Sequence, residues 1–202
     1  MPFDFLRRGK DQPAATAAQS AGGGLPRGTK GIAFDGLTED WRLIGTMLLD
    51  GRLSDVLNRR EAIPLSDVSW APIDGSEPFS PAPGLKSIDP YDLIVVLAGA
   101  DSLPPMSDEE RAAHRVHKVN FDVVLEAPPF RVTGTVYLFP GDDPERLMNR
   151  ATEMFVPVTN AVTLLGERRI NEEAVDAVLV NRSYLRTIKQ LDRPSGAPDP
   201  GR

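Results

Sequence analysis

The chain has 202 residues, of which 41% are hydrophobic and none is cysteine, and its formal net charge at pH 7 is −6. This length and apolar fraction suffice for one globular domain of ordinary size or for two small ones. The lack of cysteine excludes a disulfide framework, a thiolate metal site and a cysteine nucleophile, and His114 and His117 are too few for a structural zinc site. No apolar run is long enough for a membrane-spanning helix and no signal-peptide pattern opens the chain, so we expect a cytoplasmic protein.

The charge is distributed unevenly along the chain. Of the 23 basic and 29 acidic side chains, five basic and two acidic ones lie in residues 1–30, which leaves 18 basic and 27 acidic ones for the rest. Affinity for nucleic acid depends on clustered lysine and arginine. An acidic body therefore makes nucleic acid an improbable partner and favours a protein partner.

Both ends of the chain have the composition of disordered segments. In residues 1–30, Phe3, Phe5 and Leu6 are followed by two arginines and then by a small, polar, glycine-bearing stretch. This pattern predicts a docking peptide on a flexible tether, with a weak contact to anionic membrane or a terminus without function as alternatives. Residues 191–202, rich in proline and glycine, are predicted to be a disordered tail.

Between these ends the sequence repeats itself. Five blocks recur in the same order: IAFD with VNFD, WRLIGTMLL with FRVTGTVYL, LNR with MNR, PLSDV with PVTNA, and YDLIVV with VDAVLV. Recurrence of this kind indicates an internal duplication. We place the first unit at residues 31–98, a linker at 99–118 and the second unit at 119–190.

The second block predicts a strand that bends. In Trp41–Leu49 and in Phe130–Leu138, apolar residues alternate with others, which is the period of a β-strand. Gly45 and Gly134 stand in register, and glycine inside a strand is typical of a sharp bend or of a close backbone approach. Bent strands allow a small sheet to close into a barrel, so each unit is predicted to be a small β-barrel.

The third block predicts a short helical turn in each unit. Leu53, Val56 and Leu57 have the spacing of one buried helical face, and in the second unit Asp143 precedes a proline as an N-cap does. Asn58 and Asn149 stand where each turn must end, and asparagine tolerates the left-handed conformation of a helix exit.

The remaining blocks predict further strands and one connecting helix. In PLSDV and PVTNA, Asp67 and Asn160 are expected to hydrogen-bond nearby backbone amides. DLIVVLA is apolar at every position after its first residue, which predicts a strand that is buried on both faces. The linker contains Ser107 and Glu110 at capping-box spacing, which predicts a helix of two or three turns.

Two phrases of the first unit, RLSDVLN (52–58) and PLSDV (64–68), resemble a signature of uncharacterised bacterial small β-domains, and the second unit shares it only through the internal match. That family implies no activity. The predicted architecture is mainly β, with tandem duplicated units that resemble SH3-like or Sm-like barrels, each with one short helical turn, plus the connecting helix. A likeness of architecture does not imply a function.

A second resemblance concerns the linker. RAAHR, from Arg111 to Arg115, stands before a strand and resembles the opening of a PilZ domain, in which RxxxR binds cyclic di-GMP. Arginine suits that ligand because its planar fork bonds phosphate and stacks on bases. The second PilZ motif, D/NxSxxG, is not present in this chain, and any charged helix offers RxxxR.

The chain contains no pattern of catalytic residues. It has no GxSxG motif, no glycine-rich phosphate loop before a helix and no EF-hand spacing, so we expect no enzyme, no cofactor and no metal site. Arg52, Asp55 and Asp67 of the first unit have altered counterparts in the second, as expected if one copy kept a partner-binding role. Capping and turn formation explain the same three residues.

Three hypotheses follow from the sequence. The first is a non-enzymatic interaction or adaptor module that binds a protein through its body, with the N-terminal peptide as a second contact. The alternatives are a PilZ-like regulator that responds to a cyclic dinucleotide through Arg111 and Arg115, and an Sm-like RNA binder, which the acidic body disfavours.

Overall fold

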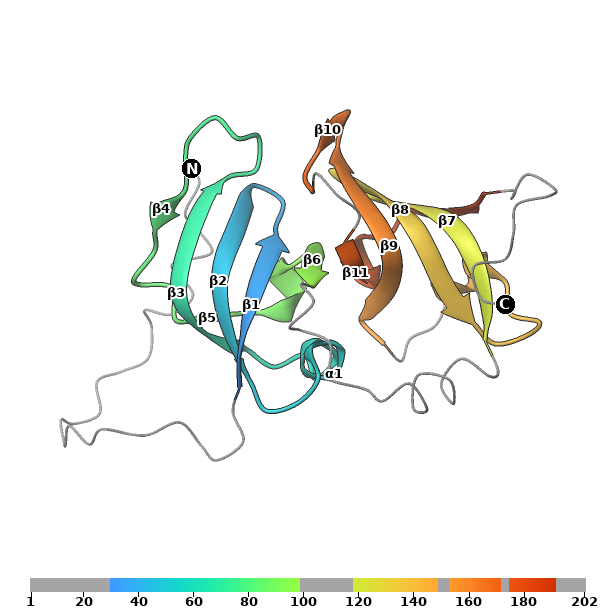
Figure 1. Cartoon of the computed structure of the whole chain (residues 1–202), viewed down its shortest axis with the longest axis horizontal. Coiled ribbons are helices and arrows are strands. Elements are labelled where there is room, and N and C mark those ends of the chain that lie inside the picture. The colour runs from blue at the N-terminus through green and yellow to red at the C-terminus, as the bar shows by residue number, and fades with distance from the viewer. Residues whose placement is uncertain (1–29, 99–117, 149–152, 172–174, 192–202) are drawn as a thin grey trace.

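The structure is a computed structural model, which describes residues 30–98, 118–148, 153–171 and 175–191 (Figure 1). Twelve strands of these ranges form one continuous antiparallel sheet, and the ranges contain one α-helix. The protein is therefore mainly β, as predicted. The predicted linker helix lies outside the described residues, as do residues 1–29 and 192–202 of the two chain ends.

The described residues divide into a first half, 30–98, and a second half, 118–191. The elements of the first half are β1 (Lys30–Leu37), β2 (Trp41–Leu49), α1 (Leu53–Asn58), β3 (Ile63–Pro72), β4 (Ser80–Pro81), β5 (Ser87–Ile88), the 3-10 turn η2 (Pro90–Asp92) and β6 (Val95–Ala98). Those of the second half are β7 (Val119–Ala127), β8 (Phe130–Leu138), the 3-10 turn η4 (Pro144–Met148), β9 (Phe155–Leu165), β10 (Arg168–Arg169), β11 (Val175–Asn181), the 3-10 turn η5 (Arg182–Tyr184) and β12 (Thr187–Gln190). The predicted strands over Trp41–Leu49 and Phe130–Leu138 and the predicted turn at Leu53 are confirmed.

The sheet is open, and this corrects the prediction of closed barrels. Its strand order is β12-β7-β8-β9-β11-β6-β1-β2-β3-β4, with β10 paired to β9 and β5 paired to β3. The two halves meet where β6 pairs antiparallel with β11. Because β6 is occupied by β1 on one edge and by β11 on the other, it is not available to close the first half into a barrel.

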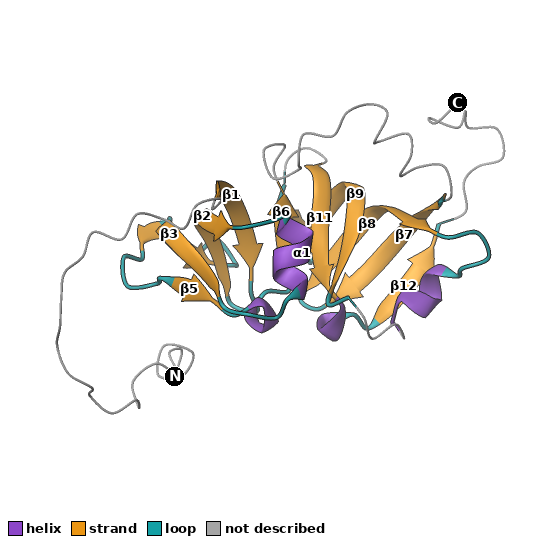
Figure 2. Ribbon diagram, turned by 90° about the horizontal axis from the view of Figure 1, so that it is seen from below, coloured by secondary structure: helices purple, strands orange, loops and turns teal. Residues whose placement is uncertain are grey.

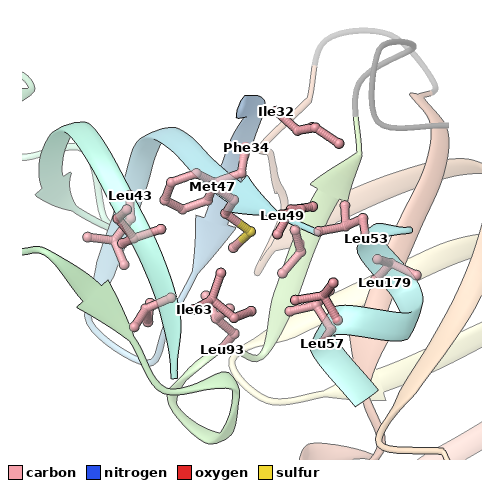
Figure 3. Close-up of a cluster of buried hydrophobic side chains, with 14 of the residues drawn as sticks. Ile32, Phe34, Leu43, Met47, Leu49, Leu53, Leu57, Ile63, Leu93 and Leu179 are labelled. Atoms are coloured by element: carbon pink, nitrogen blue, oxygen red, sulfur yellow. The ribbon is translucent and has the colours of Figure 1, made fainter. Parts of the chain in front are cut away.

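Two hydrophobic cores lie on opposite faces of the central strand pair. Val96 and Ala98 of β6 belong to the first core, whereas Val95 and Leu97 belong to the second. β11 divides its side chains in the same way, and Leu179 reaches the first core beside α1 (Figure 3). The prediction that DLIVVLA is buried on both faces is confirmed, because each half curls over a different face of this pair.

The repeated phrase marks two matching β-bulges. In the first half, two residues of β3 oppose the single residue Gly45 of β2, and Asp67 has a φ of 53°. In the second half, two residues of β9 oppose the single residue Gly134 of β8, and Asn160 has a φ of 48°. Aspartate and asparagine tolerate this left-handed conformation better than most residues. The two side chains make no hydrogen bond within the described ranges, so the expectation that they bond nearby amides is wrong.

The fifth block of the proposed repeat joins strands that are not equivalent. β6 pairs with β1, the first strand of its half, whereas β11 pairs with β9, the third strand of its half. The strand that occupies the position of β6 in the second half is β12, since it follows a 3-10 turn and pairs with β7. YDLIVV and VDAVLV are alike because both strands are buried on two faces at the joint between the halves.

The end of α1 connects the halves. Asn58 is the last residue of α1, and its Oδ1 accepts hydrogen bonds from the backbone N–H groups of Met154 and Phe155, at 2.7 and 2.9 Å. The predicted role of Asn58 as a left-handed exit is wrong, because the residue with positive φ is Arg60, at 63°. Asn149 lies outside the described residues. Figures 1 and 2 show α1 beside the central strands.

Further polar contacts cross the joint. Asn181, which is fully buried, donates to the carbonyl oxygen of Leu93 at 2.8 Å, and its backbone N–H donates to that of Ile94. At the tip of the second half, Arg168 donates to the carbonyl oxygen of Ile73. The halves are therefore held by backbone pairing, shared cores and side-chain bonds together.

Candidate functional site

The structure describes three of the residues that the sequence proposed for partner binding. Arg52 and Asp55 lie at the start of α1, and Asp67 forms the bulge of β3, with all three exposed. The hydroxyl of Ser54 lies 3.4 Å from Asp55, whereas the side chains of Arg52 and Asp67 make no hydrogen bond or ion pair with described residues. No polar contact joins the three residues. Asp55 is favourable at a helix start, and Asp67 has the conformation that the bulge requires.

The other proposed residues lie outside the described ranges. These are Phe3, Phe5 and Leu6 of the N-terminal peptide and Arg111 and Arg115 of the linker. Their roles stay predictions.

Large apolar side chains are exposed where β7 begins and β8 ends. Phe139 is 56% exposed, Val119 42% and Tyr137 39%. Tyr137 and Phe139 flank the buried Leu138 and lie on the other side of the chain from it, whereas Val119 pairs with Leu138 and shares its side. Exposed apolar side chains that cluster mark interaction surfaces more often than single ones do. We call Tyr137 and Phe139, which both line the cavity described next, the aromatic rim.

The aromatic rim borders a cavity of about 180 Å³ at the end of the second core. Buried apolar side chains form its floor, and lysine, arginine and carboxylate groups stand around its mouth. The floor residues are Val136, Leu138, Leu147 and Val156. This combination of an apolar floor with a polar rim is the anatomy of a binding site for an apolar group.

A lysine lies against Phe139, whose ring is the most exposed aromatic ring among the described residues. Nζ of Lys118 lies 5.6 Å from the centroid of Phe139, which is a cation–π distance. The same lysine lines the cavity. The contact restrains an otherwise exposed ring at the mouth, so that a ligand would meet a preformed aromatic wall.

The corresponding end of the first half is closed. There α1 places Leu53, Val56 and Leu57 into the first core, with exposures of 3, 8 and 0%. The residue after β2 is Asp50, which bonds Arg59 at 2.6 Å, whereas the residue after β8 is Phe139. The first half therefore covers this end with a helix, at the place where the second half has a cavity and an exposed ring.

The groups with displaced pKa values lie away from the cavity. The hydrogen bond from Arg42 to Asp35 raises the pKa of Arg42, and the hydrogen bonds from Ser76 lower the pKa of Asp74. Burial, and then the charges of Asp92 and Glu39, raise the pKa of Tyr184. None of these three groups lines the cavity. The site offers contact with an apolar group, bordered by the charged groups of Lys118, Asp142, Glu153 and Arg182.

The sequence reasoning missed this site, although it contained a signal. Tyr137 is an outward residue near the end of β8 and Phe139 directly follows this strand, where the first half has Leu48 and Asp50. Two aromatic residues at successive outward positions, running into the turn before Pro144, could have been read as a surface that contacts something.

In the ranges that the structure describes, no helix has the length and apolar character needed to cross a membrane. The same ranges hold no group of three or more His, Asp or Glu side chains placed to bind a metal ion. Comparison of the chain with protein-family models, with curated proteins and with solved structures finds no match.

Proposed function

We propose that this protein is a non-enzymatic interaction module that binds a protein partner through the aromatic rim and its cavity. In this proposal the body consists of two duplicated small β units of SH3-like or Sm-like type that opened and joined into one sheet. The matching bulges and the similar strand order of the halves support the duplication. The observation that carries the binding proposal is the exposure of Phe139 beside the cavity.

The size of the cavity indicates the occupant. Sites for small molecules and cofactors commonly enclose about 300–1,000 Å³. A volume of about 180 Å³ is smaller than this range. It suits one apolar side chain, and interfaces commonly depend on such an anchor in a pocket surrounded by polar contacts. We therefore propose a peptide segment with an aromatic or branched aliphatic anchor as the occupant.

The N-terminal peptide provides a second contact in this proposal. Phe3, Phe5 and Leu6 are apolar, and a tether of some twenty residues connects them to β1. Two weak contacts on one chain raise the affinity through effective concentration. The adaptor would then hold its partner at the body and at the tether.

A peptide-display selection tests the proposal. A random twelve-residue library is selected on the full-length protein, and enriched peptides are measured by fluorescence anisotropy. We expect peptides with one dominant apolar position, and we expect Phe139→Ser to weaken them at least about tenfold. Phe79→Ser is the matched control, because Phe79 is 41% exposed and also has an arginine near its ring.

The outcomes separate the possibilities. Equal loss of binding in both serine variants, or no enriched peptide, overturns the proposal. Replacement of Phe3, Phe5 and Leu6 by serine in the full chain tests the tether. If the triple variant binds enriched peptides more tightly, the peptide occupies the cavity of its own chain and is not a second contact for the partner.

A further inference from the structure

The second half ends in a strand with one unpaired edge. β12 pairs with β7 on one side, as β6 pairs with β1. On its other side β6 receives β11, whereas no strand of the described ranges lies on the corresponding side of β12. β6 therefore shows that the last strand of a half can pair with a further antiparallel strand on its second edge.

A groove of about 510 Å³ runs beside β12. Residues of β12 and η4 line it, and η4 contacts this strand. Figure 2 shows β12 at the outer end of the sheet. Four successive residues from Arg186 to Lys189 line one wall, and residues of η4 line the other. This groove is distinct from the cavity at the aromatic rim, which shares none of its lining residues.

The groove carries positive charge on an acidic protein. Arg146, Arg186 and Lys189 line it, all three exposed, and their side chains form no ion pair or hydrogen bond in the described part of the chain. Of the two acidic residues in the lining, Asp143 already accepts a hydrogen bond from the backbone N–H of Glu145 at 2.9 Å. The lining thus holds three cations and two carboxylates, a net charge of +1.

We propose that the groove binds an extended acidic segment of a partner protein, which adds as a strand to the unpaired edge of β12. Main-chain hydrogen bonds supply affinity in this mode, and side-chain contacts select the sequence. Carboxylates on the segment pair with Arg146, Arg186 and Lys189. A second copy of this chain is disfavoured as the occupant, because antiparallel pairing of two β12 strands would bring their cations close together.

The test uses a fluorescein-labelled peptide of eight alternating valine and glutamate residues and the full-length protein, with anisotropy as the readout. We expect saturable binding that weakens as salt rises. The double variant Arg186→Glu, Lys189→Glu should weaken binding at least about tenfold. The matched control is Lys86→Glu, Arg169→Glu, which changes the net charge equally at two exposed cations that do not line the groove.

Three further measurements keep the proposal falsifiable. Methylation of alternate peptide nitrogens removes hydrogen-bond donors and keeps the charge, so binding by strand addition should fall at least about tenfold. Equal binding of the methylated peptide, equal weakening by both double variants, or no binding at about 1 mM peptide would overturn the proposal. Phe139→Ser should leave this binding unchanged, which separates it from the proposed function of the cavity.

Discussion

The two halves share a framework but finish it differently. Each has a glycine-facing bulge between its second and third strands, and each has a last strand that pairs with its first. After the second strand, the first half continues into α1, which buries three apolar side chains, whereas the second half continues into the short turn η4. η4 also buries two side chains, Pro144 and Leu147, but a cavity remains beside Leu147.

The bulges also differ in how tightly they pack. A Cβ added to Gly134 would lie 2.7 Å from the carbonyl oxygen of Thr159 and 2.7 Å from Val158 Cγ1. A Cβ added to Gly45 would meet backbone atoms at 3.1 to 3.2 Å. The second half thus tolerates less added volume at the same structural position.

Alanine at the two glycines gives the largest expected effect. We expect Gly134→Ala to lower the free energy of unfolding by about 2–3 kcal/mol and Gly45→Ala by about 1 kcal/mol, because added volume forces backbone shifts. Urea unfolding followed by circular dichroism measures both. Gly84→Ala is the control, since nothing lies within 4 Å of its added Cβ. Equal losses at Gly45 and Gly134 would show that the packing difference between the bulges is not real.

The contact of α1 with the second half gives the next effect. In Asn58→Ala the N–H groups of the buried residues Met154 and Phe155 lose their acceptor, and we expect a loss of about 2 kcal/mol. Asn58→Asp keeps an acceptor oxygen and should retain most of the stability. Urea unfolding of both variants compares them. A loss in Asn58→Asp as large as in Asn58→Ala would contradict the acceptor role and indicate that the side-chain amide group matters.

The features that sequence patterns predicted correctly are those that depend on residues close together in the chain. The alternation in Trp41–Leu49, the helical spacing from Leu53 to Leu57 and the cap at Asp143 each depend on residues a few positions apart, and each is present. Glycine inside a strand predicted a bend, and Gly45 and Gly134 both face a bulge. Local periodicity and backbone preference are sufficient for such features.

Non-local contacts were beyond the sequence patterns. The pairing of β6 with β11 joins residues about eighty positions apart, and no local pattern specifies which buried strand meets which. The local sequence around Asn58 predicted a helix exit. Its role as a hydrogen-bond acceptor depends on Met154, which lies in the other half and which no local pattern indicates. The alternation around the aromatic rim predicted a strand. It could not predict that the outward side chains are exposed to solvent, because alternation does not show whether another part of the chain covers that face.

The smallest expected effect separates structure from binding at the bulge itself. Asp67 has a φ of 53°, where glycine is free of strain and alanine costs about 1 kcal/mol. We therefore expect Asp67→Gly to change the free energy of unfolding by less than about 0.5 kcal/mol and Asp67→Ala to lower it by about 1 kcal/mol. The same pair of substitutions at Asn160, with a φ of 48°, should behave alike, because the two bulges have the same geometry.

Binding measurements on the same variants test independently whether Asp67 contacts a partner. If Asp67 contacted a partner, Asp67→Gly would weaken binding of the selected peptides although its stability is normal, and Asn160→Gly would not. Anisotropy with those peptides measures this directly. Because the left-handed conformation that the bulge needs already explains Asp67, we expect unchanged affinity in both glycine variants. That result would assign the recurring PLSDV and PVTNA phrases to the bending of the sheet, and would leave recognition to the end of the second half, where the halves differ.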